Sequence, residues 1–402
     1  MAELLAPAGN MANLKTAVHF GADAVYFGGR QFGLRAFSDN FSQEEIIQAL
    51  DFLHSRGRKG YVTVNIFPRN EDFEQIKDYL RFLEDAAADA VIVSDPGVVS
   101  LCREVAPALP IHLSTQANTL NKYSARFWAD AGVKRIVLAR ELSLEEIRQI
   151  RDFIGDSAEL EVFVHGAMCI SYSGRCLLSN YLNGRDSNRG ECVQVCRWRF
   201  DIREHGTQGD WLTMEEDARG TYILNSKDLN LIRHLKPLLE AGADSFKIEG
   251  RMKSEYYVAA VVNSYRRALD DALAGRPFDE KLYDELKKAA HRKFTTGFLL
   301  GERKDSVNLE SSTPRSEYDF VAAVLGYDER RGIKVMQRNR FFVGDQLEVL
   351  SPDENHNRII NVEYMEDEEG NPVTDAKLVQ QVLYVRSDIK LKEYDMLRRK
   401  RA

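Results

Sequence analysis

The strongest constraint on the fold of this 402-residue chain is a repeated alternation of short apolar runs and amphipathic stretches across residues 3–273. The apolar runs are largely continuous, which is typical of strands covered by helices on both faces. Eight strand–helix units with right-handed crossovers close on themselves, so the pattern predicts an α/β protein with a TIM-like (β/α)8 barrel. The expected strands span residues 3–5, 24–27, 61–66, 90–93, 110–113, 135–138, 160–164 and 245–248.

The stretches around these strands predict eight helices. Ser42 and Ser143 each stand three residues before a glutamate, a spacing typical of a capping box at a helix start. An open doubly wound sheet is the alternative arrangement, but the sequence offers no Gly-rich loop of the kind that usually marks it. The expected helices span residues 10–20, 43–56, 73–85, 98–105, 122–131, 143–153, 229–240 and 255–273.

The alternation is interrupted after the seventh expected strand by an insertion at about residues 166–227. Long irregular loops are uncommon unless they have a function, and this one leaves the strand end where barrel active sites are built. We expect the barrel domain, with its insertion, to span residues 1–310. Short strands and charged turns then predict a small C-terminal antiparallel β-barrel domain at residues 311–402, ending in a solvated basic tail. Its expected strands span residues 318–324, 332–337, 345–350, 357–363 and 381–386.

Composition narrows the class of protein. Hydrophobic residues make up 44% of the chain and charged residues 29%, as in globular domains. The net charge of −7 argues against a histone-like nucleic-acid binder but is compatible with a locally basic cleft. No apolar run approaches about 20 residues, and the acidic N-terminus lacks the charge and apolar run of a signal peptide. We therefore expect a cytoplasmic protein without a membrane span.

Four of the five cysteines fall inside the insertion, as Cys169, Cys176, Cys192 and Cys196. Zinc fingers and ribbons favour paired Cys-x2-Cys spacings, and this set has none. Four thiolates arriving at irregular spacings suit a [4Fe–4S] cluster, whose iron prefers soft anionic sulfur. A structural zinc site and free cysteines are the alternatives. Cys102 lies on an apolar helix face and is expected in the core.

The insertion also interleaves arginines with aromatic residues. Guanidinium groups neutralise phosphates and aromatic faces stack on bases, so this mixture fits a splayed-out single-stranded nucleotide. Arg197 and Trp198 are the substrate-binding residues we expect from it. The alternative is that the arginines only offset the charge of a cluster and cap the loop. The residues concerned are Arg175, Arg185, Arg189, Arg197 and Arg199, with Tyr172, Tyr181 and Trp198.

Residues 161–179, EVFVHGAMCISYSGRCLLS, resemble the signature of the collagenase-like peptidase family, the unknown-catalytic-type family thirty-two. Further likeness runs over nearly the whole chain, and residues 190–198, GECVQVCRW, are most similar to the branch of tRNA 5-hydroxyuridine modification proteins. The resemblance implies an iron–sulfur-dependent, oxygen-independent hydroxylation of the wobble uridine in tRNA, with prephenate as the expected oxygen donor. Sister branches act on ribosomal RNA or a quinone precursor, and a few members degrade collagen.

Polar residues at the ends of the expected strands should meet in one mouth, because the carboxyl ends of barrel strands share a face. A dicarboxylate donor would call for an arginine clamp, for which Arg140 and Arg251 are the candidates. Glu249 is a candidate general base, with Lys247 as its expected partner, and His165 could move a proton. The full set of mouth residues is Asn65, Asp95, Ser114, Gln116, Arg140, His165, Glu249 and Arg251.

A peptidase is the main alternative to a hydroxylase. The sequence has neither a Gly-x-Ser-x-Gly elbow nor a His-Glu-x-x-His helix, which two common hydrolase mechanisms require. Cys169 with His165 could be proposed as a thiol dyad, although the same cysteine belongs to the fourfold set. A non-catalytic RNA-binding module is the third reading, and it predicts tRNA binding with steep salt dependence.

Overall fold

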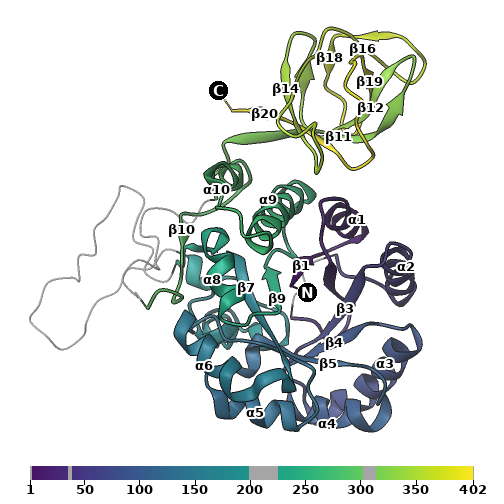
Figure 1. Cartoon of the computed structure of the whole chain (residues 1–402). Coiled ribbons are helices and arrows are strands. Elements are labelled where there is room, and N and C mark those ends of the chain that lie inside the picture. The colour runs from purple at the N-terminus through teal and green to yellow at the C-terminus, as the bar shows by residue number, and fades with distance from the viewer. Residues whose placement is uncertain (1, 35–38, 199–224, 302–313, 402) are drawn as a thin grey trace, which may run out of the picture.

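Eight parallel strands close into a barrel in the computed structural model, which describes residues 2–34, 39–198, 225–301 and 314–401 (Figure 1). The last of them pairs in parallel with both the seventh and the first, which closes the barrel and confirms the predicted TIM-like fold. The strands are β1 (Glu3–Pro7), β2 (Ala24–Gly28), β3 (Lys59–Val64), β4 (Ala90–Val93), β5 (Ile111–Leu113), β6 (Arg135–Val137), β7 (Glu159–Ala167) and β9 (Ser245–Ile248).

Helices surround this barrel, and most begin within a few residues of their predicted starts. The capping boxes predicted at Ser42 and Ser143 are both formed, each with its glutamate three residues on. The helices are α1 (Met11–His19), α2 (Gln43–His54), α3 (Phe73–Asp85), α4 (Pro96–Val105), α5 (Lys122–Asp130), α6 (Leu144–Ile154), α8 (Leu235–Glu240) and α9 (Glu255–Leu273), followed by α10 (Glu280–Lys287).

The helix predicted over residues 229–240 is wrong at its start, since a 3-10 turn at Ile232–His234 leads into the α-helix. Before this turn the chain forms the short strand β8 (Asp228–Asn230), which pairs antiparallel with the end of β7 and parallel with β10 (Phe294–Thr295). β7 is long enough to run past the barrel, so its last residues offer backbone groups that β8 satisfies. This tertiary pairing overrides the local helical pattern, and the helix begins only at Leu235.

The C-terminal domain consists of an eight-stranded antiparallel sheet, curled around its own apolar core, and a separate two-stranded sheet, as predicted in class. The proposed boundary at residues 310 and 311 lies outside the described residues. The strands are β11 (Tyr318–Asp328), β12 (Gly332–Gln337), β13 (Phe341–Phe342), β14 (Gln346–Leu350), β15 (Ile359–Asn361), β16 (Met365–Glu366), β17 (Pro372–Val373), β18 (Asp375–Ala376), β19 (Val382–Val385) and β20 (Met396–Lys400).

The basic tail does not form the solvated terminus that was expected. It contributes β20 to the sheet, and the Arg398 guanidinium is completely buried against Glu285 of α10 and Glu348 of β14. Arg398 thereby joins the two domains, and Figure 1 shows the β-domain seated beside α9 and α10. Within the described residues, no helix combines the length and apolar character needed to cross a membrane.

Candidate active site

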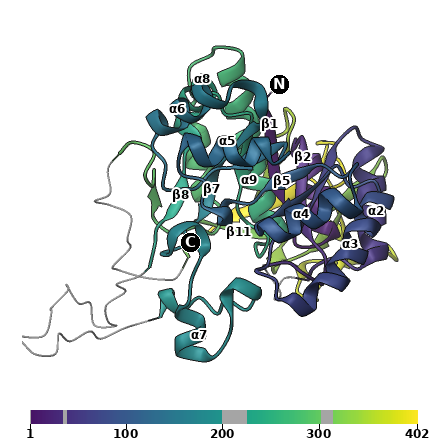
Figure 2. The same cartoon turned by 90° about the horizontal axis from the view of Figure 1, so that it is seen from below.

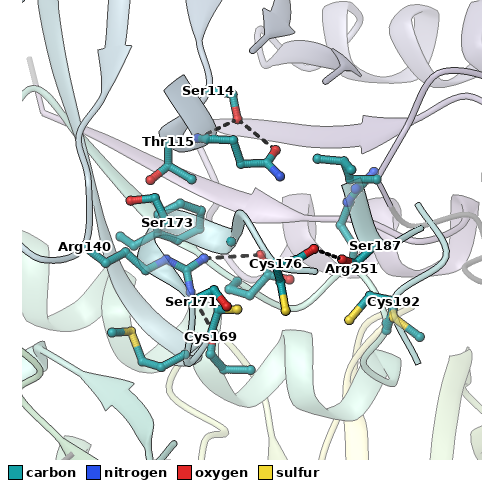
Figure 3. Close-up of a pocket in the computed structure, with 18 of the residues that line it drawn as sticks. Ser114, Thr115, Arg140, Cys169, Ser171, Ser173, Cys176, Ser187, Cys192 and Arg251 are labelled. Carbon is teal, nitrogen blue, oxygen red and sulfur yellow. Dashed lines mark hydrogen bonds and ion pairs between the residues drawn. The ribbon is translucent and has the colours of Figure 1, made fainter. Parts of the chain in front are cut away.

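A cavity of about 380 Å³ lies at the mouth of the barrel (Figure 3). One part of its lining comes from strand ends, and the other from the cysteine loop, by which we mean residues 168–198. Figure 3 shows Ser114 and Thr115 on one side and Cys169, Cys176 and Cys192 on the other. Figure 2 shows α7 (Leu178–Asn183), in the middle of this loop, standing away from the barrel helices. The cavity has the size of a small-molecule site.

All four cysteines of the insertion line this cavity, as free thiols. Burial raises the pKa of Cys196 to about 11; Arg197 opposes this rise, while the charges of the other three thiols add to it. Cys102 is the separate core residue that the sequence indicated, buried on α4. Four soft donors from one loop thus line the same cavity.

The four thiols do not form a tight site for a single ion. Among the described residues, no group of three or more cysteine, histidine, aspartate or glutamate side chains is placed to hold one metal ion. A structural zinc site would close around one point, whereas a [4Fe–4S] cluster takes four thiolates around a larger polynuclear body. The number and kind of donors in the cavity therefore fit the cluster, whose ligation stays a prediction.

Three arginines of the cysteine loop hold the loop in place through hydrogen bonds to other groups of the protein. Arg197 donates to the carbonyl oxygen of Met168 at 3.2 Å and to the side chain of Asn225 at 2.8 Å. Arg175 Nε donates to the carbonyl oxygen of Gln116 at 2.6 Å, and Arg189 forms a bidentate pair with Asp72. Arg197 also lines the cavity, so its expected substrate-binding role stays a prediction beside this anchoring. Arg199 lies outside the described residues.

The aromatic residues of the loop are exposed. Tyr172 is 54%, Tyr181 79% and Trp198 44% accessible, and none of them lines the cavity. Trp198 was expected to bind substrate, and its place in the structure is on the surface of the loop beside Arg197. The loop therefore presents its aromatic side chains to solvent.

Glu141 is a residue that the sequence reasoning missed. It follows β6 directly after Arg140, lines the cavity, and accepts hydrogen bonds from the backbone N and the Oγ of Ser173, each at 2.8 Å. Ser173 lies between Cys169 and Cys176 and adopts φ 45°, a left-handed conformation that is strained for a residue other than glycine. The strand-end rule that selected Arg140 would have selected Glu141 as well.

Most of the predicted mouth residues do meet in the cavity. Asn65 and Ser114 both donate to Gln116 Oε1, at 3.1 and 3.5 Å, and Arg251 donates to Thr63 Oγ1 at 3.1 Å. Arg140 makes more contacts within the protein. Its Nη1 donates to the carbonyl oxygen of Ala167 at 2.7 Å, and its guanidinium lies 3.8 Å from the Phe163 ring centroid. Its other terminal nitrogen is 3.8 Å from Glu249 Oε2. Glu249 also lines the cavity.

Two of the expected mouth residues are elsewhere. Asp95 caps α4 by accepting from the backbone of Gly97 and Val98. His165 is buried behind the cavity, 3.3 Å from the Tyr265 hydroxyl and packed on the Phe294 ring, and burial lowers its pKa to about 3. It stays neutral and away from the cavity, so neither the proton-moving role nor a dyad with Cys169 has support in this geometry.

The floor of the cavity is formed by a buried lysine. Lys247 donates to Glu161 Oε1 at 2.8 Å, not to Glu249 as expected. Glu161 is also 3.2 Å from Arg135, which pairs with Glu3 at 2.5 Å deeper in the barrel. The barrel interior beneath the site therefore holds two cations and two anions in one network.

The chain is thus a TIM-barrel protein with a cavity at the barrel mouth, and this cavity combines polar groups from the strand ends with four thiols. The profile of Peptidase family U32 matches residues 9–309, and that of the Peptidase family U32 C-terminal domain matches residues 316–398. The chain belongs to this family, and the resemblance expected from the sequence is confirmed.

Curated relatives carry names of more than one activity. The chain is 43% identical to tRNA hydroxylation protein P1 of Bacillus subtilis (strain 168), over 99% of this chain and 94% of that protein. It is 41% identical to tRNA hydroxylation protein P of Escherichia coli (strain K12), over 92% and 90%. It is 30% identical to the Collagenase of Porphyromonas gingivalis (strain ATCC BAA-308 / W83), over 87% and 86%.

Proposed function

We propose that this protein is an RNA-modifying hydroxylase that acts on tRNA. The finer proposal is formation of 5-hydroxyuridine at the wobble position without molecular oxygen, with a [4Fe–4S] cluster held by Cys169, Cys176, Cys192 and Cys196 and with prephenate as oxygen donor. The observation that carries it is the presence of all four thiols in the same cavity as the polar strand ends. Similarity to two tRNA hydroxylation proteins over nearly the whole chain supports the tRNA substrate.

The residues of the cavity have separate tasks in this proposal. When bound, a cluster with four thiolate ligands supplies one-electron transfer. Arg251 and the group of Asn65, Ser114 and Gln116 offer hydrogen bonds that orient a small polar ligand. Glu249 is the carboxylate that we assign to accept the proton leaving C5 of the uracil ring. Replacement of this hydrogen by the donor's hydroxyl group is a two-electron oxidation, so the two electrons would have to leave, one at a time through the cluster, to a redox-protein acceptor.

Proteolysis is disfavoured by the same geometry. A thiol peptidase needs a base within hydrogen-bond reach of its cysteine. His165 is turned into an aromatic cage with Tyr265, away from the cavity that Cys169 lines.

The test is mass spectrometry of tRNA nucleosides from a strain that lacks this protein, complemented with variants. We expect 5-hydroxyuridine to disappear on deletion and to return with the unaltered protein. Cys192→Ala should fail to restore it and should yield protein without iron. Cys102→Ala is the matched control, because that thiol is buried outside the cavity, and it should restore the nucleoside. An unchanged nucleoside profile on deletion would refute the tRNA assignment. Loss of a hydroxylated nucleoside from ribosomal RNA instead would identify ribosomal RNA as the substrate.

A further inference from the structure

The floor of the cavity presents an ammonium group with unused hydrogen-bond donors. Lys247 is 4% exposed and lines the cavity. A lysine ammonium has three donors, and among the described residues Nζ donates one hydrogen bond, to Glu161. Its remaining close contacts are ring faces, with the Tyr26 centroid at 4.3 Å and the Phe163 centroid at 5.4 Å. Two N–H groups thus have no oxygen acceptor within the described part of the chain.

Burial lowers the pKa of Lys247, and the Glu161 carboxylate opposes this shift and holds the ammonium in place. Glu161 is shared between Lys247 and Arg135, and Arg135 is also paired with Glu3. Removing the positive charge of Lys247 would leave two buried carboxylates with one cation, which is costly in a barrel interior. The charges of the network are therefore balanced without a ligand, yet one side of the Lys247 ammonium still faces the cavity.

The wall of the cavity also favours an anion. Six cationic side chains line it against two carboxylates, Glu141 and Glu249. Several of the cations are already engaged, since Arg140 holds Ala167 and Arg197 holds Met168 and Asn225. Arg251 and Lys247 are the two that lie on β9 or directly after it, and both are almost fully buried.

We infer that Lys247 binds a carboxylate group of a small organic acid at the floor of the cavity. This inference rests on the proposed function, for which it names the subsite of the dicarboxylate co-substrate. The carboxylate receives two N–H bonds from Lys247, which takes the place of the engaged Arg140 in the expected clamp of Arg140 and Arg251. A charge-assisted hydrogen bond at a buried site contributes about ten- to a hundredfold in affinity.

The experiment measures binding of two probes, malonate and prephenate, to the purified full-length protein by calorimetry at pH 7. Lys247→Met should weaken both by at least about tenfold. Glu161→Gln removes the carboxylate partner of Lys247, so a bound carboxylate becomes the counter-charge of this buried side chain and both probes should bind at least as tightly as to the unaltered protein.

The double variant Lys247→Met with Glu161→Gln separates recognition from structure, because it restores the balance of one cation and one anion. If Lys247 binds the ligand, the double variant stays weak. If Lys247 only balances the buried charge, the double variant recovers the affinity of the unaltered protein, and the inference is overturned. Thermal unfolding shows whether Lys247→Met folds. If Lys247→Met does not fold, the double variant alone is compared with the unaltered protein.

Failure of the subsite and failure of the proposed function give different results. Malonate binding that depends on Lys247 supports the subsite even where deletion of the protein leaves tRNA nucleosides unchanged. Prephenate binding that is indifferent to Lys247 overturns the subsite, although loss of 5-hydroxyuridine on deletion would uphold the function. Absence of binding of both probes to the unaltered protein also overturns the subsite.

Discussion

Replacing Glu141 should loosen the part of the cysteine loop that lies between Cys169 and Cys176. The Glu141 carboxylate holds Ser173 through two hydrogen bonds of 2.8 Å, and Ser173 adopts a left-handed conformation at φ 45°. That conformation costs about 1–2 kcal/mol for a residue with a side chain, so it persists only while its contacts hold it. The Glu141 contacts therefore hold Ser173 in a backbone conformation that it would not adopt by itself.

The magnitude follows from the two bonds. Hydrogen bonds to a charged group contribute about 1.5–3 kcal/mol each, and the partial exposure of Glu141 reduces this because water replaces part of what is lost. Glu141→Gln keeps one carbonyl acceptor and should cost about 1–2 kcal/mol locally. Glu141→Ala removes both acceptors and should cost about 2–4 kcal/mol. Since about 1.4 kcal/mol is tenfold in an equilibrium, opening of this segment should become roughly tenfold and roughly a hundredfold more frequent, respectively.

The assay is hydrogen exchange of backbone amides in residues 171–175, measured on protein prepared without iron so that the result does not depend on a cluster. Ser173→Ala removes only the hydroxyl bond and should give a smaller effect than Glu141→Ala. Glu145→Gln, on the exposed face of α6, is the matched control and should change nothing in this segment. Unaltered protection in Glu141→Ala would show that the two bonds do not hold the loop.

Three further changes test other parts of the molecule. Burial opposes ionisation of Glu285, but the charges of Arg398 and Lys288 outweigh burial and hold the pKa of Glu285 at about 2. The ionised carboxylate therefore stabilises the fold fully above the unfolded-state pKa of 4.5, and this contribution is lost as pH falls from about 4.5 to about 2. Urea unfolding compared between pH 7 and pH 3 should therefore show an acid loss about 2 kcal/mol smaller in Glu285→Gln, because the folded carboxyl group is still mostly ionised at pH 3. Gly166→Ala should lower the melting temperature more than Gly155→Ala: both positions have positive φ, but only at Gly166 would the new Cβ lie 2.4 Å from the Glu249 carbonyl oxygen. Trp198→Ala should weaken tRNA binding by about 1–3 kcal/mol with unchanged unfolding, and Trp198→Phe should bind nearly normally, because stacking requires only an aromatic face; equal affinity of both variants would exclude Trp198 as a stacking platform.

The barrel and the meeting of the thiols were within reach of the sequence because both follow from simple periodicity. Continuous apolar runs at regular spacing specify parallel strands, and the carboxyl ends of such strands share one face. Cys169 leaves that face directly after β7, so the insertion had to return across the mouth. Strand β8 was not predictable in the same way. Residues 228–230 gain their strand from pairing with the overhanging end of β7, a partner more than sixty positions away.

The error over His165 has a local cause in β7. Glu161 and Phe163 lie toward the barrel interior, and plain alternation places His165 on the same side. The pairing of β7 with β9 instead shifts register between Phe163 and His165, as in a β-bulge. One extra residue reverses the direction of the side chains that follow it, which sends His165 into the cage around Tyr265. A bulge depends on the partner strand, so one strand's residue pattern does not reveal it.

The arginines of the cysteine loop show a different limit of sequence reasoning, and they change what salt dependence should mean for this protein. Composition alone fits either phosphate binding or loop anchoring, since both need a guanidinium group. In the structure, Arg175, Arg189 and Arg197 donate hydrogen bonds to carbonyl and carboxylate groups of the protein itself. Each phosphate contact by a free cation adds close to one unit to the salt dependence of RNA binding, whereas stacking on Tyr181 or Trp198 adds none. Binding through this loop should therefore depend only weakly on salt, and a steep dependence would have to arise from cations elsewhere on the chain.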